Sequence, residues 1–286
     1  MPAPTSSAPV NVASVPQRSI FRYPGGKTWL VPQVRAWLRS LPRRPRLLVE
    51  PFAGGGIIGL TAVAENLVDR AILVELDPNV AAVWKVLING DAEQLARRIE
   101  KFELTHDSVV KELTKVPRTD MALAFQTILR NRVQRGGIMA PGAGLMREGE
   151  NGKGLASRWY PETLARRIRD IIEYRDRIDF VQGDGLEVMA EHTAQRATVL
   201  FVDPPYTAGG KSAGSRLYEA RHLDHDKLFQ LARRHKGDVL LTYDNALEVR
   251  GLAAKSGFVV RPIAMKSTHN AEMSELLIGR DLRWVL

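Results

Sequence analysis

The sequence predicts an α/β fold, in which a largely parallel sheet is covered by helices on both faces. Amphipathic stretches suited to helices occupy Ile57–Glu65, Asn79–Asn89 and Asp226–Arg234. Strands that alternate with such helices are typical of parallel sheets, and the first two candidate strands lie about twenty residues apart, as in a β-α-β unit. The candidate strands are short apolar runs bounded by turn or helix signals, at Leu47–Glu50, Ala71–Glu75, Ile178–Gln182, Thr198–Asp203, Asp238–Tyr243, Gly257–Arg261 and Glu275–Gly279.

The alternation of strands and helices stops in the middle of the chain. Residues 91–176 are charged and helical in pattern, with a Gly-rich loop at Gly136–Gly154 and no candidate strand. We therefore predict a helical insert over residues 91–176 that divides a sheet domain made of residues 20–90 and 177–286. Residues 1–19 are rich in Pro, Ser and Ala, which predicts a disordered tail.

The composition excludes several classes of protein. The 286 residues are 44% hydrophobic, which is enough to bury a full core. The absence of Cys excludes disulfides, thiolate nucleophiles and Cys-based metal sites. We find no apolar run long enough to span a membrane, and residues 1–19 lack the basic start and apolar stretch of a secretory signal. A cytoplasmic protein of bacterial or phage origin would fit these observations.

The charge is unevenly distributed along the chain. The formal net charge is +9, and the segment Ile128–Arg169 alone holds nine basic residues against three acidic ones, a local excess of +6. A concentrated basic segment favours a polyanionic partner such as nucleic acid, because phosphate contacts release counterions. An Arg-rich helix is also common as ordinary exposed surface, and that alternative stays open.

The first candidate site is the turn after the first predicted strand, Glu50-Pro51-Phe52-Ala53-Gly54-Gly55-Gly56. Glycines at such a turn allow positive φ angles and let a ligand approach the backbone closely. A pyrophosphate site would show G-x-G-x-x-G without a preceding acid, so the carboxylate of Glu50 is better suited to a cationic cofactor. The alternative is a tight α/β turn without a ligand.

The second candidate is Glu75, which ends the next predicted strand. An acid about twenty residues after a glycine turn is the group that accepts hydrogen bonds from ribose hydroxyls in nucleotide-binding sheets. Asp77 competes for this role, but it can also cap the following helix, which has Pro78 in its first turn. We favour Glu75 because it lies directly at the strand end.

The third candidate is Asp203-Pro204-Pro205-Tyr206, which follows an apolar strand. Asp203 can accept a hydrogen bond from an exocyclic amine, and Pro204, which cannot donate, offers its carbonyl as a second acceptor. Two acceptors on one planar amine draw its lone pair out of conjugation, and consecutive prolines hold the acceptors in place. Tyr206 provides a flat face on which a flipped base can stack. A simple strand-terminating turn is the alternative interpretation.

Together these motifs closely resemble those of the Dam-type, or alpha-group, DNA adenine N6-methyltransferases, from about Ile20 to Leu282. The resemblance also includes Arg22-Tyr23-Pro24-Gly25-Gly26-Lys27 and the closing strand Ser274-Glu275-Leu276-Leu277-Ile278. It implies a Rossmann-like methyltransferase sheet, a mostly helical target-recognition insert, and S-adenosyl-L-methionine (AdoMet) as the cofactor.

The resemblance also implies roles for individual residues. Tyr23 and Lys27 would contact AdoMet, with Lys27 near its carboxylate, and Asp203 to Tyr206 would hold the target base. Glu75 would bind the ribose, and Asp184 would reach the adenine amine of the cofactor. The methionine side of the cofactor would be lined by Glu50, Pro51, Phe52, Gly54 and Gly56, with Asp203 also bordering the cofactor.

Target recognition is expected from the insert. Asn131-Arg132, followed by Gly136-Gly137, falls where the family has an Asn-Arg pair and a Gly, but Val133-Gln134-Arg135 replaces the family's aromatic residues. Recognition of GATC is therefore not carried over, and a different site or relaxed specificity is equally compatible. The candidate DNA contacts are Arg130, Asn131, Arg132, Arg135, Lys153 and Arg158.

These observations predict methyl transfer from AdoMet to N6 of an adenine flipped out of duplex DNA. N4-cytosine methylation is a close alternative, although those enzymes usually carry Ser in place of Asp203, and RNA adenine methylation stays open. C5-cytosine methylation is excluded because it needs a Cys nucleophile. A DNA-binding module that has lost its cofactor would be expected to show damaged motifs, and none is damaged.

No metal is chemically needed, and we interpret His222, His225 and His269 as surface or DNA-contact residues. The oligomeric state is not fixed by the sequence, and a monomer would fit. Restriction-modification, phage protection and regulation remain open as biological roles.

Overall fold

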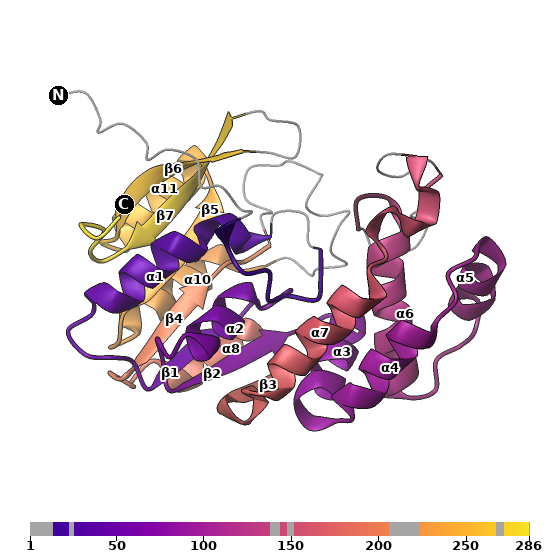
Figure 1. Cartoon of the computed structure of the whole chain (residues 1–286). Coiled ribbons are helices and arrows are strands. Elements are labelled where there is room, and N and C mark those ends of the chain that lie inside the picture. Colours follow the sequence, from indigo (N-terminus) through magenta and orange to yellow (C-terminus); the bar gives the residue numbers. More distant parts are fainter. Residues whose placement is uncertain are drawn as a thin grey trace.

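The computed structural model describes residues 14–22, 26–137, 144–147, 152–205, 223–266 and 272–285. At its centre is a seven-stranded sheet with the order β3-β2-β1-β4-β5-β7-β6 (Figure 1). The strands are β1 (Leu47–Glu50), β2 (Arg70–Glu75), β3 (Ile178–Gln182), β4 (Thr198–Val202), β5 (Val239–Asp244), β6 (Val259–Lys266) and β7 (Glu272–Gly279).

The sheet is of the Rossmann type. Strands β1 to β5 are parallel, whereas β7 is antiparallel to both β5 and β6. This is the doubly wound strand order with one antiparallel strand inserted near the edge. The predicted α/β class is thereby confirmed, and all seven predicted runs fall on observed strands. Because β1 to β5 are parallel, their carboxyl ends lie along one edge of the sheet.

The largest error in the predicted strands concerns β6, which was expected to end at Arg261 and continues to Lys266. Pro262 lies within it, opposite Leu276 of β7. Proline is tolerated there because β6 is an edge strand, so a missing N–H costs no interior hydrogen bond. Arg261 and Pro262 interrupt the apolar residues of β6, and this interruption hid the extension from a prediction based on apolar runs.

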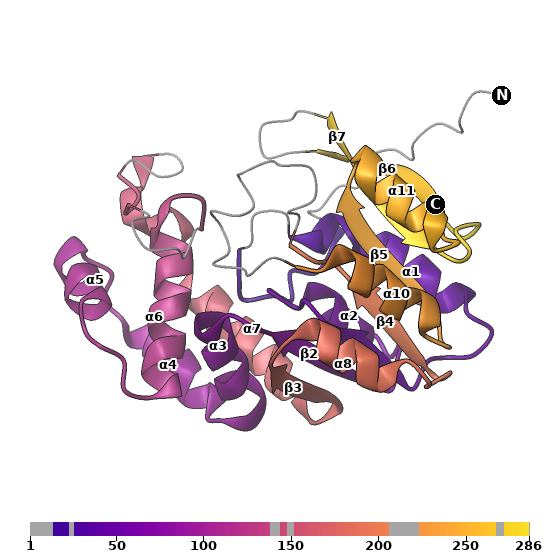
Figure 2. The ribbon, with the colours of Figure 1, turned by 180° about the vertical axis from the view of Figure 1, so that it is seen from behind.

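Helices cover both faces of the sheet and form two hydrophobic cores. Helices α1, α2 and α3 border the first core, and α8, α10 and α11 border the second, as the two views in Figures 1 and 2 show. Asp77, Asp184 and Asp224 cap three of these helices through side-chain oxygens that accept backbone N–H groups. The helices are α1 (Val31–Ser40), α2 (Ile57–Ala64), α3 (Pro78–Asn89), α8 (Gly185–His192), α10 (His225–Arg234) and α11 (Leu247–Lys255).

The insert is helical in the part that the structure describes. It contains α4 (Ala92–Lys101), α5 (His106–Leu113), α6 (Asp120–Val133) and α7 (Pro161–Ile172), and an isolated β-bridge joins Gln134 to Leu145. These helices gather beside α3 at one end of the sheet (Figure 1). The first core continues into the insert, where apolar residues of α4, α6 and α7 are buried. The insert and the sheet therefore share one hydrophobic core.

Residues 14–19 belonged to the expected tail, but the structure describes them as a packed segment. Val15 is buried, and the Ser19 hydroxyl donates a hydrogen bond of 2.6 Å to the carbonyl oxygen of Gly55. Arg18 contacts Glu65 at 3.3 Å. Residues 1–13 of the expected tail lie outside the described residues. Within the described ranges, no helix is both long and apolar enough to cross a membrane.

Candidate active site

Three of the expected acids meet at the carboxyl edge of the sheet. Glu50 ends β1, Glu75 ends β2, and Asp203 directly follows β4. Because β1 pairs in parallel with both β2 and β4, the fold brings these residues to the same edge. Glu50 is only 3% exposed.

The glycine turn between β1 and α2 is held by those acids. Gly54 and Gly56 adopt positive φ angles of 48° and 60°. One Glu75 oxygen, Oε2, accepts a hydrogen bond of 3.1 Å from the Gly54 N–H, and the other, Oε1, accepts one of 2.9 Å from Asp77. Glu50 Oε2 accepts a bond of 2.7 Å from the N–H of Gly59 in the first turn of α2. Both carboxylates therefore shape the backbone that a cofactor would contact.

Trp84 of α3 is a supporting residue that sequence reasoning missed. Its indole Nε1 donates a hydrogen bond of 2.9 Å to the carbonyl oxygen of Gly54. A Cβ atom at Gly56 would lie 2.7 Å from the Trp84 ring, so only glycine fits there. No local sequence signal relates a tryptophan in the following helix to this turn.

Burial changes the pKa values of two acids at this edge, Glu50 and Glu75. Desolvation raises the pKa of Glu50 to about 8, although the hydrogen bond from Gly59 opposes the rise. Burial likewise raises the pKa of Glu75 to about 7. A nearby cation favours the ionised form of such carboxyls. AdoMet carries a sulfonium and an ammonium group, so the carboxylates of this edge fit that cofactor.

Asp203 belongs to a buried ionic cluster, which we call the Lys27 cluster and define as Lys27, Asp203, Thr242 and Glu275. Lys27 Nζ lies 3.0 Å from Asp203 Oδ1 and 3.4 Å from Glu275 Oε2. The Thr242 hydroxyl donates a hydrogen bond of 2.7 Å to the same Asp203 oxygen. Burial opposes the charge of Lys27, but the two carboxylates outweigh it and raise the pKa of the lysine.

The ammonium of Lys27 lies between two carboxylates of the chain itself, and the expected proximity of Lys27 to the cofactor carboxylate stays a prediction. Thr242 and Glu275 were not predicted as site residues. Glu275 has a recognisable signal, since it is an acid directly before the apolar run Leu276–Ile278. Thr242 has none, because a threonine in a buried strand is ordinary.

Asp184 lies between Gly183, whose N–H donates to the carbonyl oxygen of Glu75, and Gly185, which packs on Pro51. It caps α8 by accepting a hydrogen bond of 2.8 Å from the N–H of Leu186. The next residue, Gly185, packs so closely on the turn after β1 that an added Cβ would lie 2.2 Å from the Pro51 carbonyl oxygen. Asp184 is exposed and remains a candidate for the adenine amine of the cofactor.

The remaining predicted site residues are placed as follows. Pro204 is buried, and Phe52 and Pro205 are partly buried. Tyr23 and Tyr206 lie outside the described residues. Among the described residues, no group of three or more His, Asp or Glu side chains could hold a metal ion.

The Asn-Arg pair of the insert is buried at the end of α6. Asn131 accepts a hydrogen bond of 2.9 Å from the Arg22 N–H and donates to the carbonyl oxygens of Arg22 and Gly137, at 2.9 and 3.1 Å. Arg132 donates to the carbonyl oxygen of Ile20. Asn131 and Arg132 are 1% and 4% exposed. They hold the segment 19–22 in place and do not form part of the surface.

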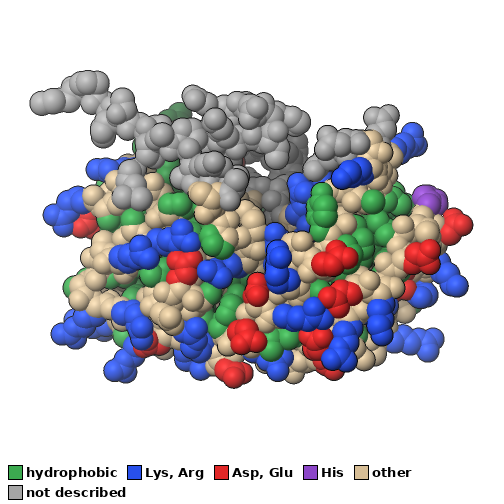
Figure 3. All heavy atoms as spheres, viewed as in Figure 1, with side chains coloured by type: hydrophobic (Ala, Val, Ile, Leu, Met, Phe, Trp, Pro, Cys, Tyr) green, Lys and Arg blue, Asp and Glu red, His purple; other side chains and the backbone are tan. Residues whose placement is uncertain are grey.

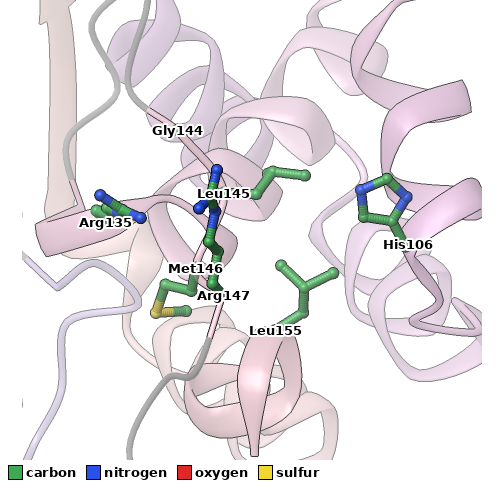
Figure 4. Close-up of a pocket in the computed structure, with 7 residues that line it drawn as sticks. All are labelled: His106, Arg135, Gly144, Leu145, Met146, Arg147 and Leu155. Atoms are coloured by element: carbon green, nitrogen blue, oxygen red, sulfur yellow. The ribbon is translucent and has the colours of Figure 1, made fainter.

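Other predicted DNA contacts reach the surface. Arg135 and Lys153 are exposed, whereas Arg130 and Arg158 are partly buried. Arg135 also lines a pocket of about 760 Å³ in the insert, where it and His106 lie at opposite ends (Figure 4). On the face shown in Figure 3, Lys and Arg side chains are spread over the surface and interleaved with Asp and Glu.

Comparison with known proteins supports this reading of the sequence. Residues 23–117 match the family model of the D12 class N6 adenine-specific DNA methyltransferases, which confirms the resemblance over that stretch. The matched stretch contains Lys27, the glycine turn and Glu75, and it ends before Asp203. No protein with a curated description matches the chain.

Several solved structures are similar in fold. PH1948 from Pyrococcus horikoshii, assigned as an RNA methyltransferase, has 11% identity and a TM-score of 0.43, over 94% of this chain and 92% of that chain. The rRNA methyltransferase aviRa from Streptomyces viridochromogenes has 15% identity and a TM-score of 0.39, over 93% and 90%. Spermidine synthase from Thermotoga maritima has 12% identity and a TM-score of 0.40, over 88% and 57%. These distant likenesses do not bear on the substrate.

The family match covers the part of the chain that builds the glycine turn and its acids. Those acids lie at the carboxyl edge of a Rossmann-like sheet, which is where such sheets bind nucleotides. The chain is therefore a methyltransferase that uses S-adenosyl-L-methionine as its cofactor.

Proposed function

We propose that this methyltransferase transfers a methyl group to N6 of adenine in DNA. The observation that carries the proposal is the fixed carboxylate of Asp203, which follows β4 and is held by Lys27 and Thr242 directly before Pro204. A carboxylate and a prolyl carbonyl side by side form a pair of acceptors for one exocyclic amine. The description of the matching family supports adenine as the base and DNA as the polymer.

The residues of the chain orient the amine and leave the bond changes to the two substrates. When bound, AdoMet supplies a methyl group on a positively charged sulfur. The N6 electron pair would accept this methyl group, and the electrons of its bond to sulfur would stay on the sulfur. N6 then loses a proton to water. Asp203 and the Pro204 carbonyl hold the amine for this attack, and no covalent enzyme intermediate is needed.

The target adenine must leave the helical stack to reach Asp203, at a cost of a few kcal/mol. We assign the compensating contacts to the insert, where Arg130, Arg135, Lys153 and Arg158 are the candidates for phosphate or base contact. The pocket lined by Arg135 and Arg147 suits a polyanionic partner. Asn131 and Arg132 contribute indirectly, by fixing the segment 19–22.

The experiment is a comparison of the wild-type protein with Asp203→Ala on unmethylated DNA. Methylated nucleosides are measured by mass spectrometry after nuclease digestion. We expect N6-methyladenine from the wild type and a rate at least about a hundredfold lower from the variant, because a transition-state acceptor is lost. Stabilisation by AdoMet should persist in both proteins. Asp226→Ala, which changes an exposed acid on α10, is the matched control and should keep the wild-type rate.

Near-normal turnover by Asp203→Ala would overturn the proposed role of the motif. N4-methylcytosine as the product would instead favour the cytosine alternative. Methylation of RNA with none of DNA would move the proposal to an RNA adenine methyltransferase.

A further inference from the structure

Glu275 is a buried carboxyl in the closing strand β7, and no motif assigns it a role. The register places it opposite Asp244 of β5 and Ile263 of β6. Glu275 is only 5% exposed, and its Oε2 lies 3.4 Å from Lys27 Nζ. The antiparallel direction of β7 brings this residue to the carboxyl end of β5, beside the site where the acids of the parallel strands gather.

A buried acid at this position is costly for folding. Removing a carboxylate from water costs several kcal/mol, and a well-packed apolar side chain is often at least as stable as a buried ion pair. The next three residues of β7, Leu276, Leu277 and Ile278, are such apolar side chains and are fully buried. Burial raises the pKa of Glu275 to about 7, even though Lys27 opposes the rise. A contribution to the free energy of folding therefore does not explain why a carboxyl occupies this position.

The connection to Asp203 runs through Lys27. The lysine has two acidic partners, and Asp203 Oδ1 receives both the Lys27 ammonium and the Thr242 hydroxyl. If Lys27 had Asp203 as its sole partner, the full positive charge would be drawn to that carboxylate and would weaken it as an acceptor for an amine. A second carboxylate shares the positive charge and keeps the ammonium at a fixed place.

We propose that Glu275 is a positioning residue for methyl transfer, which acts through Lys27 to set the orientation and the acceptor strength of the Asp203 carboxylate. The inference rests on the proposed function, because it requires Asp203 to hold the target amine. The charged groups that face Glu275 are Lys27 from the 3-10 helix η2 (Lys27–Leu30), Asp203 from the end of β4, and Asp244 from β5. The position opposite it on β6 is the uncharged Ile263.

The first test is Glu275→Gln, which keeps the shape of the side chain and removes its charge. We expect kcat to fall about tenfold, while the dissociation constants of AdoMet and DNA change by less than roughly twofold, because the interaction acts on the transition state. The melting temperature should be unchanged or higher. Glu248→Gln, at an exposed position of α11, is the matched control and should keep the wild-type kcat.

Two further measurements separate positioning from a structural role. Glu275→Asp retains the charge and should restore part of the lost kcat. With AdoMet and DNA saturating, the wild-type kcat should rise with pH through about 7, as Glu275 ionises. The Glu275→Gln variant should lack this rise. A structural role would instead change stability and binding, without a matching change in the pH profile.

A wild-type kcat in Glu275→Gln, or an unaltered pH profile, would overturn the inference. So would a variant that loses AdoMet binding in proportion to its activity. If Glu275→Gln does not fold, Glu275→Asp takes its place in the test. A kcat of Glu275→Asp that does not rise through neutral pH would then overturn the inference. Failure of the proposed function looks different, because the wild-type protein itself would then form no N6-methyladenine.

Discussion

The carboxyl edge of the sheet and the end of helix α6 both hold polar side chains that the sequence marks, but the fold uses them differently. At the sheet edge, Glu50, Glu75 and Asp203 bond the local backbone or neighbouring side chains, and we propose that the cofactor and the target amine bind beside them. At the end of α6, Asn131 and Arg132 are buried, and their hydrogen bonds go to the backbone of the chain. One set of polar residues is arranged for chemistry, and the other is arranged for architecture.

The difference follows from the geometry of the two elements. The carboxyl ends of parallel strands meet at one edge, so a residue at a strand end is placed as soon as the strand is recognised. A residue on a helix can face the core or the solvent, and its direction depends on what packs there. Four experiments test this difference between the sheet edge and the end of α6.

Gly185→Ala should have the largest effect. The new Cβ would lie 2.2 Å from the Pro51 carbonyl oxygen, so the starts of α8 and of the glycine turn must separate. We expect a loss of about 3 kcal/mol in the free energy of unfolding and weaker AdoMet binding. Urea denaturation and AdoMet titration measure these changes. Gly251→Ala is the control, because a Cβ added there would meet no atom within 4 Å outside its own helix backbone. Equal stability of the two variants would contradict the assigned contact.

Asn131→Ala tests the architectural role of the α6 pair. The change leaves backbone groups of Arg22 and Gly137 without their hydrogen bonds, of which the bond to Gly137 is buried and those to Arg22 are partly buried. We expect the free energy of unfolding to fall by about 2 kcal/mol, because each unsatisfied buried group costs a desolvation penalty. Chemical denaturation measures the loss, with exposed Asn89→Ala as the control. If the variant is as stable as the wild type but binds DNA more weakly, Asn131 would instead be a residue that contacts DNA.

The dependence of AdoMet binding on pH tests the chemical role of the sheet edge. Burial raises the pKa of Glu50 to about 8 and of Glu75 to about 7, so both are largely protonated at pH 6 in the cofactor-free protein. A cationic ligand favours the ionised forms, so affinity should increase roughly tenfold between pH 6 and pH 8 and then level off.

The stability of the cofactor-free protein should change in the opposite direction. The folded pKa values lie above the unfolded value of 4.5, so the stabilisation from these two groups is complete below that value and is lost as pH rises through about 8. Melting temperatures with and without AdoMet, taken across this range, measure both trends. An AdoMet-induced shift that is constant with pH would contradict the proposed contact between these acids and the cofactor.

Arg135→Ala and Lys153→Ala should have the smallest effect, and one confined to DNA. Both residues are exposed, so the fold should be unchanged. If each contacts a phosphate, the slope of log affinity against log salt should decrease in magnitude by about 1 per residue, with the methylated base unchanged. Arg283→Ala, at an exposed residue near the C-terminus, is the control. Salt slopes equal to that of the wild type would show that neither residue contacts a DNA phosphate.

The sequence was sufficient for most of the sheet and for the motif residues at its carboxyl edge. Alternation of apolar runs and glycine turns reflects strand burial directly, and this is why all seven runs fall on strands. Lys27 shows where such reasoning stops. Its two partners, Asp203 and Glu275, are distant in sequence, and only the antiparallel placement of β7 brings them together. Glu275 carried a sign of its role in the sequence, whereas Trp84 and Thr242 carried none.

The segment 19–22 has a practical consequence for protein engineering. Its backbone accepts hydrogen bonds from Asn131, Arg132 and Arg167 of the insert, and the Ser19 hydroxyl bonds the glycine turn at Gly55. A chimera in which residues 91–176 alone are exchanged would separate the transplanted helices from the backbone segment to which they donate hydrogen bonds in their own protein. Grafts that carry residues 14–22 along with the helices should give soluble hybrids more often.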